Sequence, residues 1–234
     1  MAKKKVTRKQ LLKGPDEFIS FSSRLLESAI KYKIQISFAL GVILLLVIVV
    51  SGIRYFSNKD ENRAFALLDQ AVIGYNLIVK DSGPEKAYEN ISQNFDFIIK
   101  KYSGRDAAKL AGLIYANICY NAGDYEKATA LYNKSLQDFK NYPSINTFIL
   151  SGTGYNCEAK KDYKAAVNYF EMIVSQSGAI MKDQALFNLG RLYATMDENE
   201  KSLNAFKKIV SDYTDSIYIE LARERVNGEN LPFK

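Results

Sequence analysis

A segment of twenty uncharged residues, 34–53, constrains this chain more than any other feature of its sequence. It reads IQISFALGVILLLVIVVSGI, with Lys31 and Lys33 before it and Arg54 after it. A helix rises about 1.5 Å per residue, so a helix of this length covers the ~30 Å hydrocarbon core of a bilayer. A buried core helix is the alternative, but a soluble helix normally keeps one polar face and this segment has none. We therefore predict a transmembrane helix over 34–53.

The charged residues are divided unequally by this segment. The chain has 32 Lys and Arg against 26 Asp and Glu, a net charge of +6, which taken alone suggests nucleic-acid binding. Residues 1–33 hold nine basic and three acidic side chains, so the remainder of the chain is neutral. Excess positive charge beside a span is typical of its cytoplasmic side. The sequence predicts a cytoplasmic N-terminus, a C-terminal part across the membrane, and no nucleic-acid partner.

A cleaved signal peptide is a further alternative for 34–53. The preceding region is 33 residues long and the apolar run is about twice the usual signal core, so a retained anchor fits better. No Cys closes the run, as a bacterial lipoprotein would require. We expect a single-pass protein with its membrane-interface side chains on both flanks of the span, namely Lys31, Lys33, Arg54, Tyr55 and Phe56.

The residues before the span fall into two parts. Residues 1–14 form a basic arm without a hydrophobic pattern, which we expect near cytoplasmic headgroups. Residues 15–33 predict an amphipathic helix, because apolar side chains recur at threes and fours: Phe18, Phe21, Leu25, Ala29 and Tyr32. Such a helix could lie in the membrane interface, pack on a membrane partner, or simply lead into the span.

After the span, the pattern is helical throughout, so the fold class is all-α. Residues 54–62 are predicted to be a linker, and 63–226 a domain of helical hairpins, followed by a tail over 227–234. The first hairpin joins a helix near 63–80 to one near 84–102, because Pro84 suits a first helical turn. A closing helix is expected over 217–226.

Three further hairpins share one pattern of small and aromatic residues. Small residues stand at Ala116, Gly154 and Gly190, with spacings of 38 and 36. Twelve residues after each comes another small residue, and four later an aromatic one: Ala128, Ala166 and Ser202, then Tyr132, Phe170 and Phe206. Two helices approach closely where small side chains meet, and a large ring then fills the remaining space. The pattern predicts a stack of helical repeats.

This arrangement resembles the tetratricopeptide repeat, a helical hairpin of about 34 residues with small residues in both helices and an aromatic late in the second. The segment ALFNLGRLYA at 185–194 is the most similar to the first helix of that family. The resemblance implies an α-solenoid over about 63–213. The connectors KKYSGRDAAKLA and SDYTDSIYIELA are also similar to those of bacterial envelope repeat proteins.

The sequence contains few residues or motifs of the kinds that catalyse reactions or bind cofactors. The chain has no His, which removes imidazole metal ligands and Ser-His-Asp catalysis. The glycines of SGTGYN at 151–156 lie inside a predicted helix, where close packing explains them better than a phosphate loop. The acids of DYEKA, DYKAA and DENEK occupy helix starts, where capping is their expected role. We expect no enzyme, no cofactor and no metal site.

The two cysteines, Cys119 and Cys157, stand at the same position of successive first helices. A disulfide between repeats is one interpretation. Packed helices lie about 8–10 Å apart, whereas bridged Cα atoms lie within about 7 Å, which favours two small buried hydrophobic residues.

First helices of such repeats line a concave groove, and its mixed aromatic and amide surface would suit an extended polypeptide. By register, the groove residues are Leu113, Asn117, Asn121, Ser151, Tyr155, Phe187 and Arg191. Alternatively, a closing helix or the chain's own termini fill the groove.

Topology and repeats together resemble the YfgM family of ancillary subunits of the bacterial Sec translocon. The shared features are Gly41 to Leu44 in the span, then Gly52, Arg54, Tyr55 and Phe56, before a helical repeat domain. The resemblance implies a periplasmic domain at the inner membrane that associates with SecYEG and the membrane-bound chaperone PpiD and passes client polypeptides to periplasmic chaperones. The alternative is an envelope-assembly scaffold related to outer-membrane or division machinery.

Overall fold

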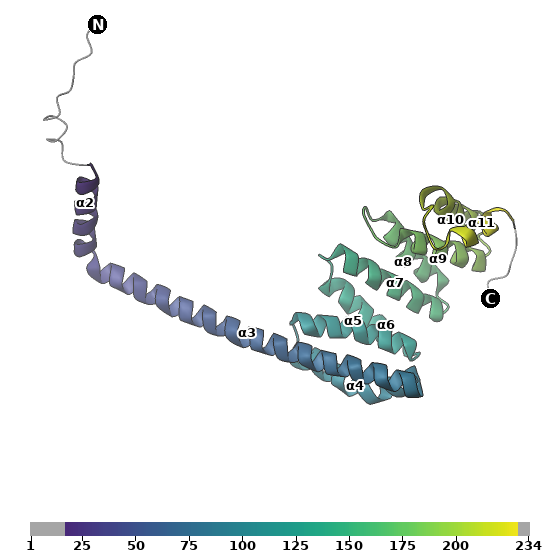
Figure 1. The fold of residues 1–234 in the computed structure, drawn as a ribbon, viewed down its shortest axis with the longest axis horizontal. Helices are drawn as coiled ribbons and strands as arrows, with labels where there is room; N and C mark the ends of the chain where they lie inside the picture. The colour runs from purple at the N-terminus through teal and green to yellow at the C-terminus, as the bar shows by residue number, and fades with distance from the viewer. Residues whose placement is uncertain (1–16, 229–234) are drawn as a thin grey trace, which may run out of the picture. The chain divides into compact units, whose positions relative to one another are not determined.

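The computed structural model describes residues 17–228, and every regular element in that part of the chain is an α-helix (Figure 1). The predicted basic arm and most of the predicted tail lie outside the described residues. The helices are α2 (Glu17–Lys31), α3 (Lys33–Ser82), α4 (Pro84–Lys101), α5 (Asp106–Asn121), α6 (Tyr125–Asp138), α7 (Pro143–Ala159), α8 (Tyr163–Ser175), α9 (Lys182–Thr195), α10 (Asn199–Asp212) and α11 (Ile219–Val226). The chain divides into two compact units between Lys59 and Asp60.

The apolar segment 34–53 forms the N-terminal part of α3, a helix of 50 residues. Among the described residues, α3 is the one helix long and apolar enough to cross a membrane, and its apolar window is not buried in the fold. A core helix of a soluble protein would be covered by its neighbours. The exposure of this segment therefore agrees with a membrane span and disagrees with a buried core helix.

The predicted linker over 54–62 is helical and belongs to α3. The sequence there, RYFSNKDEN, contains residues of modest helix propensity but neither Pro nor Gly. Each such residue costs only a few tenths of a kcal/mol relative to Ala, about 0.7 at most. A polar composition alone does not end a helix, so the segment predicted as a linker continues α3.

Beyond Asp60 the chain forms a succession of antiparallel hairpins, visible in Figure 1 from the teal of α4 to the yellow of α11. The C-terminal part of α3, from Ala64 onward, shares a hydrophobic cluster with α4, α5 and α6. Pairs α5–α6, α7–α8 and α9–α10 make the hairpins, and α4–α5, α6–α7 and α8–α9 make the contacts between them. This is an all-helical stack of the tetratricopeptide type, as the spacing predicted.

Glycines in the first helices allow the aromatic rings of the second helices to approach the backbone. A Cβ built on Gly154 would lie 2.9 Å from the ring of Phe170, and one on Gly190 would lie 2.6 Å from the ring of Phe206. Gly152 makes the corresponding space for Tyr132, which comes from the preceding hairpin. Packing within hairpins and between them therefore uses the same small-to-aromatic contact.

The turn inside each of these hairpins has one left-handed residue at the same position: Gly123 (φ 82°), Lys161 (φ 62°) and Asp197 (φ 60°). The acids that follow were expected to cap the next helix. Asp124 and Asp162 do so, because each carboxylate accepts a hydrogen bond of 3.1 Å from the backbone N–H three residues on. Glu198 makes no such side-chain bond.

The start of α5 is capped by a carboxylate from α3. Glu61 Oε1 accepts from the N–H of Ala107 at 2.7 Å, and Oε2 accepts from the N–H of Asp106 at 3.3 Å. A negative group is favourable at a helix N-terminus, because the first N–H groups have no partner within the helix. This contact ties the first helix of the repeat unit to the second hairpin.

The last hairpin is covered by the connector and helix α11. Ala222 of α11 is fully buried, and Tyr218 stacks on Phe187 with ring centroids 4.7 Å apart. The expected closing helix is thus present, although it begins at Ile219. Both cysteines are free thiols, Cys119 buried in α5 and Cys157 partly buried in α7.

Replacing Gly190 by Ala is expected to destabilise the fold. The new methyl group would collide with the ring of Phe206, and such overpacking typically costs about 1–3 kcal/mol, more than the ~1 kcal/mol gained in helix propensity. Gly112 is the matched control, because it is also buried in a first helix but has no atom within 4 Å of a built Cβ. Gly112→Ala should therefore stabilise the fold, because it gains helix propensity without a collision. Thermal unfolding of the full chain in detergent, followed by circular dichroism, measures both; equal effects would contradict this packing.

The two thiols are expected to react at different rates. Burial raises the pKa of the Cys119 thiol to about 12 and also raises that of Cys157, and only the thiolate reacts. Because Cys157 is partly exposed, it should be modified first in the native chain, and Cys119 mainly after unfolding. A thiol-titrating reagent at mildly alkaline pH separates the phases. Cys157→Ser should abolish the faster one; a chain with no titratable thiol would instead indicate a disulfide.

Candidate functional site

Three predicted groove residues occupy one register position of successive first helices: Asn117 in α5, Tyr155 in α7 and Arg191 in α9. The spacing of the repeats places them on the same side of the stack. Their side chains, however, are engaged with neighbouring residues of the chain. The surface that they offer is therefore set by their partners as well as by their own chemistry.

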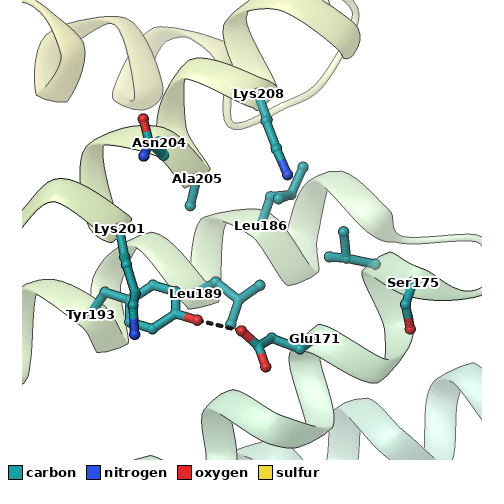
Figure 2. Close-up of a pocket in the computed structure, with 10 residues that line it drawn as sticks. Glu171, Ser175, Leu186, Leu189, Tyr193, Lys201, Asn204, Ala205 and Lys208 are labelled. Carbon is teal, nitrogen blue, oxygen red and sulfur yellow. Dashed lines mark hydrogen bonds between the residues drawn. The ribbon is translucent and has the colours of Figure 1, made fainter. Parts of the chain in front are cut away.

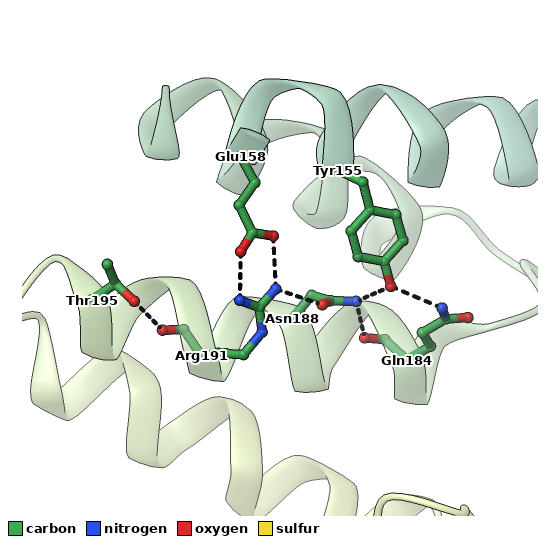
Figure 3. Close-up of polar contacts among 6 residues, drawn as sticks. All are labelled: Tyr155, Glu158, Gln184, Asn188, Arg191 and Thr195. Atoms are coloured by element: carbon green, nitrogen blue, oxygen red, sulfur yellow. Dashed lines mark hydrogen bonds and ion pairs between the residues drawn. The ribbon is translucent and has the colours of Figure 1, made fainter. Parts of the chain in front are cut away.

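Tyr155 is fixed by two amides from the next first helix. Its hydroxyl oxygen accepts hydrogen bonds from Gln184 Nε2 at 2.9 Å and from Asn188 Nδ2 at 2.8 Å, as Figure 3 shows. Its ring meets Phe170 edge to face, with centroids 5.4 Å apart. Because both ends of the side chain are held, Tyr155 presents a fixed aromatic face.

Arg191 is paired with Glu158, which sequence reasoning did not single out. Two parallel hydrogen bonds join the guanidinium to the carboxylate, the one between Nη2 and Oε2 measuring 2.7 Å (Figure 3). Nη2 also donates to Asn188 Oδ1 at 3.1 Å. The bond to Glu158 raises the pKa of Arg191, so the group stays charged. Arg191 consequently offers a neutralised ion pair to a ligand, since its charge is already balanced.

Asn117 is the exposed member of the three. Its Nδ2 donates to the carbonyl of Leu113 at 3.2 Å, and its Oδ1 accepts from the hydroxyl of Tyr132 at 2.7 Å. Asn121, one turn further along α5, is also exposed. Both amides are exposed on α5, and their place in a partner-binding groove stays a prediction.

A hollow of about 440 Å³ opens where the first helices end. It is lined by two predicted residues and five others: Tyr155 and Arg191, with Tyr120, Glu158, Ala159, Lys161 and Tyr163. Burial raises the pKa of Tyr120, so its phenol remains a neutral donor. Three phenol rings, one ammonium group and one ion pair give a surface with both apolar area and hydrogen-bonding groups. Such a surface suits polypeptide better than it suits a small charged metabolite.

The other register position predicted for the groove does not reach this hollow. Ser151 is buried, with 5% of its surface exposed, so its assignment to an exposed groove was wrong. Leu113 is half-buried against the core. Phe187 is covered by Tyr218 and by Phe206. Tyr218, from the connector that leads into α11, therefore shields part of this surface.

The lining residues that were not predicted share only weak sequence features that could have indicated a surface site. Tyr120 and Glu158 occupy one register position, 38 residues apart, one turn after the predicted Ala116 and Gly154. Lys161 and Tyr163 belong to the turn motif KKDYKAA. Because turn residues were expected only to cap helices, their contribution to a surface was not anticipated.

A second hollow, of about 420 Å³, lies among α8, α9 and α10 (Figure 2). Its apolar lining includes Leu186 and Leu189, and Lys201 and Lys208 project from α10. The hydroxyl of Tyr193 donates to Glu171 across it. The sequence had not indicated this hollow, because its lining comes from three helices.

The predicted membrane-interface residues are all exposed on α2 and α3. Lys31 closes α2, where its ammonium lies 5.5 Å from the ring centroid of Tyr32, and Lys33 opens α3. At the other end of the apolar run, Arg54 precedes Tyr55 and Phe56, whose rings meet edge to face at 5.6 Å. The aromatic and basic groups thus flank the apolar segment at both ends.

Within residues 17–228, no group of three or more Cys, Asp or Glu side chains is arranged to hold a metal ion. The groups of the repeats with a raised pKa are partly buried phenols and thiols, together with cations that hydrogen-bond to a carboxylate, such as Arg191 and the exposed Lys201. Tyr115, for example, has its pKa raised by burial while its hydroxyl accepts from Lys127 at 2.7 Å. These interactions stabilise the packing of α4, α5 and α6.

Comparison with known proteins identifies one segment. Residues 184–216 match the tetratricopeptide repeat family. No curated protein matches the chain. The matched segment covers most of α9, all of α10 and the start of the following connector. The chain therefore contains a tetratricopeptide repeat, in an all-helical fold whose other hairpins share its small and aromatic positions.

Proposed function

We propose that this chain is a membrane-anchored adaptor whose repeats bind polypeptide close to the membrane. The observation that carries the proposal is the hollow of three phenol rings and the Glu158–Arg191 ion pair at the ends of α5, α7 and α9. A repeat of this family typically mediates contacts between proteins. The apolar segment of α3 supplies the anchor.

The hollow has the chemistry that a polypeptide requires. Phenol rings give rigid apolar contact area at a low cost in side-chain entropy, and their hydroxyls can pair with peptide groups. The ion pair is neutral as a whole, so the net charge of the lining comes from the ammonium group of Lys161. We therefore expect recognition of extended segments with apolar side chains and modest dependence on sequence.

The charge asymmetry supports an orientation. Nine of the basic side chains precede the apolar segment, and the rest of the chain is neutral. By the positive-inside rule, the N-terminus lies in the cytoplasm and the repeats lie across the membrane, in the periplasm if the membrane is a bacterial inner membrane.

The resemblance to the YfgM family extends this proposal to specific partners. It suggests that the repeats act near the exit of the SecYEG translocon, beside a PpiD-like chaperone, and receive secreted polypeptides as clients. What supports it is the combination of the span with its Gly41 to Leu44 segment, the Tyr55 and Phe56 pair, and the following repeats.

A photo-crosslinking residue at Asn121 is expected to capture translocon subunits or exported polypeptides in cells. Asn121 follows Tyr120 at the edge of the hollow, and Asn133 on α6 is a matched exposed asparagine away from it. Tyr163→Ala should lower capture from Asn121 about fivefold, as expected for ~1 kcal/mol of lost contact. Equal capture from both asparagines, or recovery of neither class of protein, would contradict the proposal. Recovery of outer-membrane assembly or division proteins would favour the scaffold alternative.

Protease added to bacterial spheroplasts that express the full chain is expected to remove the repeats and leave a short membrane-protected N-terminal fragment. The expectation follows from the basic residues before the apolar segment. Digestion after detergent permeabilisation provides the control for protection. Repeats that become accessible only after permeabilisation would place them in the cytoplasm and overturn the periplasmic assignment.

A further inference from the structure

Helix α2 has an apolar face that the described fold leaves uncovered. Its large apolar side chains are between 55% and 64% exposed: Phe21, Leu25, Leu26 and Ile30. None of the three hydrophobic clusters formed by the described side chains includes a residue of α2 from Phe21 onward. A helix with this many exposed large apolar groups normally packs against another protein surface or a membrane.

The apolar and polar residues of α2 are separated around its axis. At about 100° per residue, Phe21, Leu25 and Ile30 fall within roughly half of the circumference. The opposite side carries Arg24 and Glu27, with Lys31 at the C-terminal end. This distribution is that of an interfacial helix, apolar on one side and charged on the other.

The position of α2 follows from its attachment to α3. Only Tyr32 separates the two helices, and backbone hydrogen bonds continue across it, from Tyr32 N to Ser28 O at 3.0 Å and from Ile36 N to Tyr32 O at 2.9 Å. The apolar segment begins two residues later, at Ile34. Wherever that segment enters a bilayer, the C-terminal end of α2 is therefore held at the bilayer surface.

Two orientations of α2 differ in what its apolar face meets. A helix of 15 residues is about 22 Å long, so α2 standing perpendicular to the membrane would keep most of its apolar face in water. Lying along the surface, it places that face among acyl chains and leaves Arg24 and Glu27 in water. Lys31 and Lys33 would then stand beside anionic headgroups, which attract them.

We propose that α2 lies flat in the headgroup region of the leaflet that α3 enters, with Phe21, Leu25, Leu26 and Ile30 facing the acyl chains. Its ligand is the lipid surface, not a protein groove or a second α2. The proposal rests on the membrane span proposed for α3. In this position α2 holds the start of α3 at one depth and resists its rotation, because turning or lifting α3 would withdraw the apolar face from lipid.

Single tryptophans test this placement directly, because the chain has no Trp of its own. The full chain is reconstituted in vesicles of phosphatidylcholine and phosphatidylglycerol, with or without lipids brominated near the headgroup or deep in the acyl chain. Phe21→Trp reports the apolar face, Glu27→Trp is the control on the polar face of the same helix, and Leu45→Trp reports the span.

We expect blue-shifted emission from Phe21→Trp and a loss of intensity that is greater with the shallow bromines than with the deep ones. Acrylamide in the aqueous phase should quench the emission of Glu27→Trp, and either brominated lipid should quench it little. The emission of Leu45→Trp should be quenched most by the deep bromines.

Phe21→Trp quenched by acrylamide alone would show α2 in water and overturn the proposal. Blue-shifted emission that no brominated lipid quenches would show the face covered by protein and also overturn it. If Leu45→Trp escapes quenching, the span itself fails; quenching there without quenching at Phe21 rejects only the placement of α2.

Discussion

Close contact between a glycine backbone and an aromatic ring organises the repeats. Phe170 lies against Gly154 and Phe206 against Gly190, at distances that leave no room for a methyl group. The same contact joins successive hairpins through Tyr132 and Gly152. The contact occurs within α7–α8, within α9–α10 and between α6 and α7, where it helps to stack the first helices so that their C-terminal ends meet on one side. The hollow at those ends follows from that stacking, since its lining comes from all three.

The polar groups of the hollow are tied to one another before any ligand arrives. Glu158 and Arg191 form a bidentate pair, and Tyr155 accepts from the amides of Gln184 and Asn188. A ligand therefore meets rings and paired charges whose geometry is already set, and loses less entropy on ordering them. Because Glu158 and Arg191 neutralise each other, the net charge of the lining comes from Lys161.

The apolar segment and the first helix of the repeat unit belong to one helix, α3. Glu61 caps α5 from that helix, and Asp60 pairs with Arg105 at 3.7 Å. The beginning of the repeat unit is therefore stabilised by residues that follow the apolar segment by less than ten positions. At the other end, Ala222 of α11 is buried against the last hairpin, and Tyr218 stacks on Phe187, which stays partly exposed.

The sequence by itself determined the features that depend on local composition and period. The uncharged length of 34–53 identifies the span candidate, and the recurrence of Gly154, Gly190, Phe170 and Phe206 predicts the hairpins, because each hairpin packs through contacts close in sequence. The continuous helix through 54–62 was missed because its propensities are only mildly unfavourable and do not decide between helix and linker.

Only the tertiary structure decided which predicted groove residues form a surface. Ser151 is buried, Phe187 is covered, and Arg191 is neutralised by Glu158, 33 residues away. Such outcomes depend on how each hairpin is rotated against the next. A rotation of a fraction of a helical turn is enough to move a side chain from the exposed surface into the packed interface between hairpins. A repeat period specifies which residues are equivalent, whereas the packing angle between hairpins specifies which of the equivalent residues meet solvent.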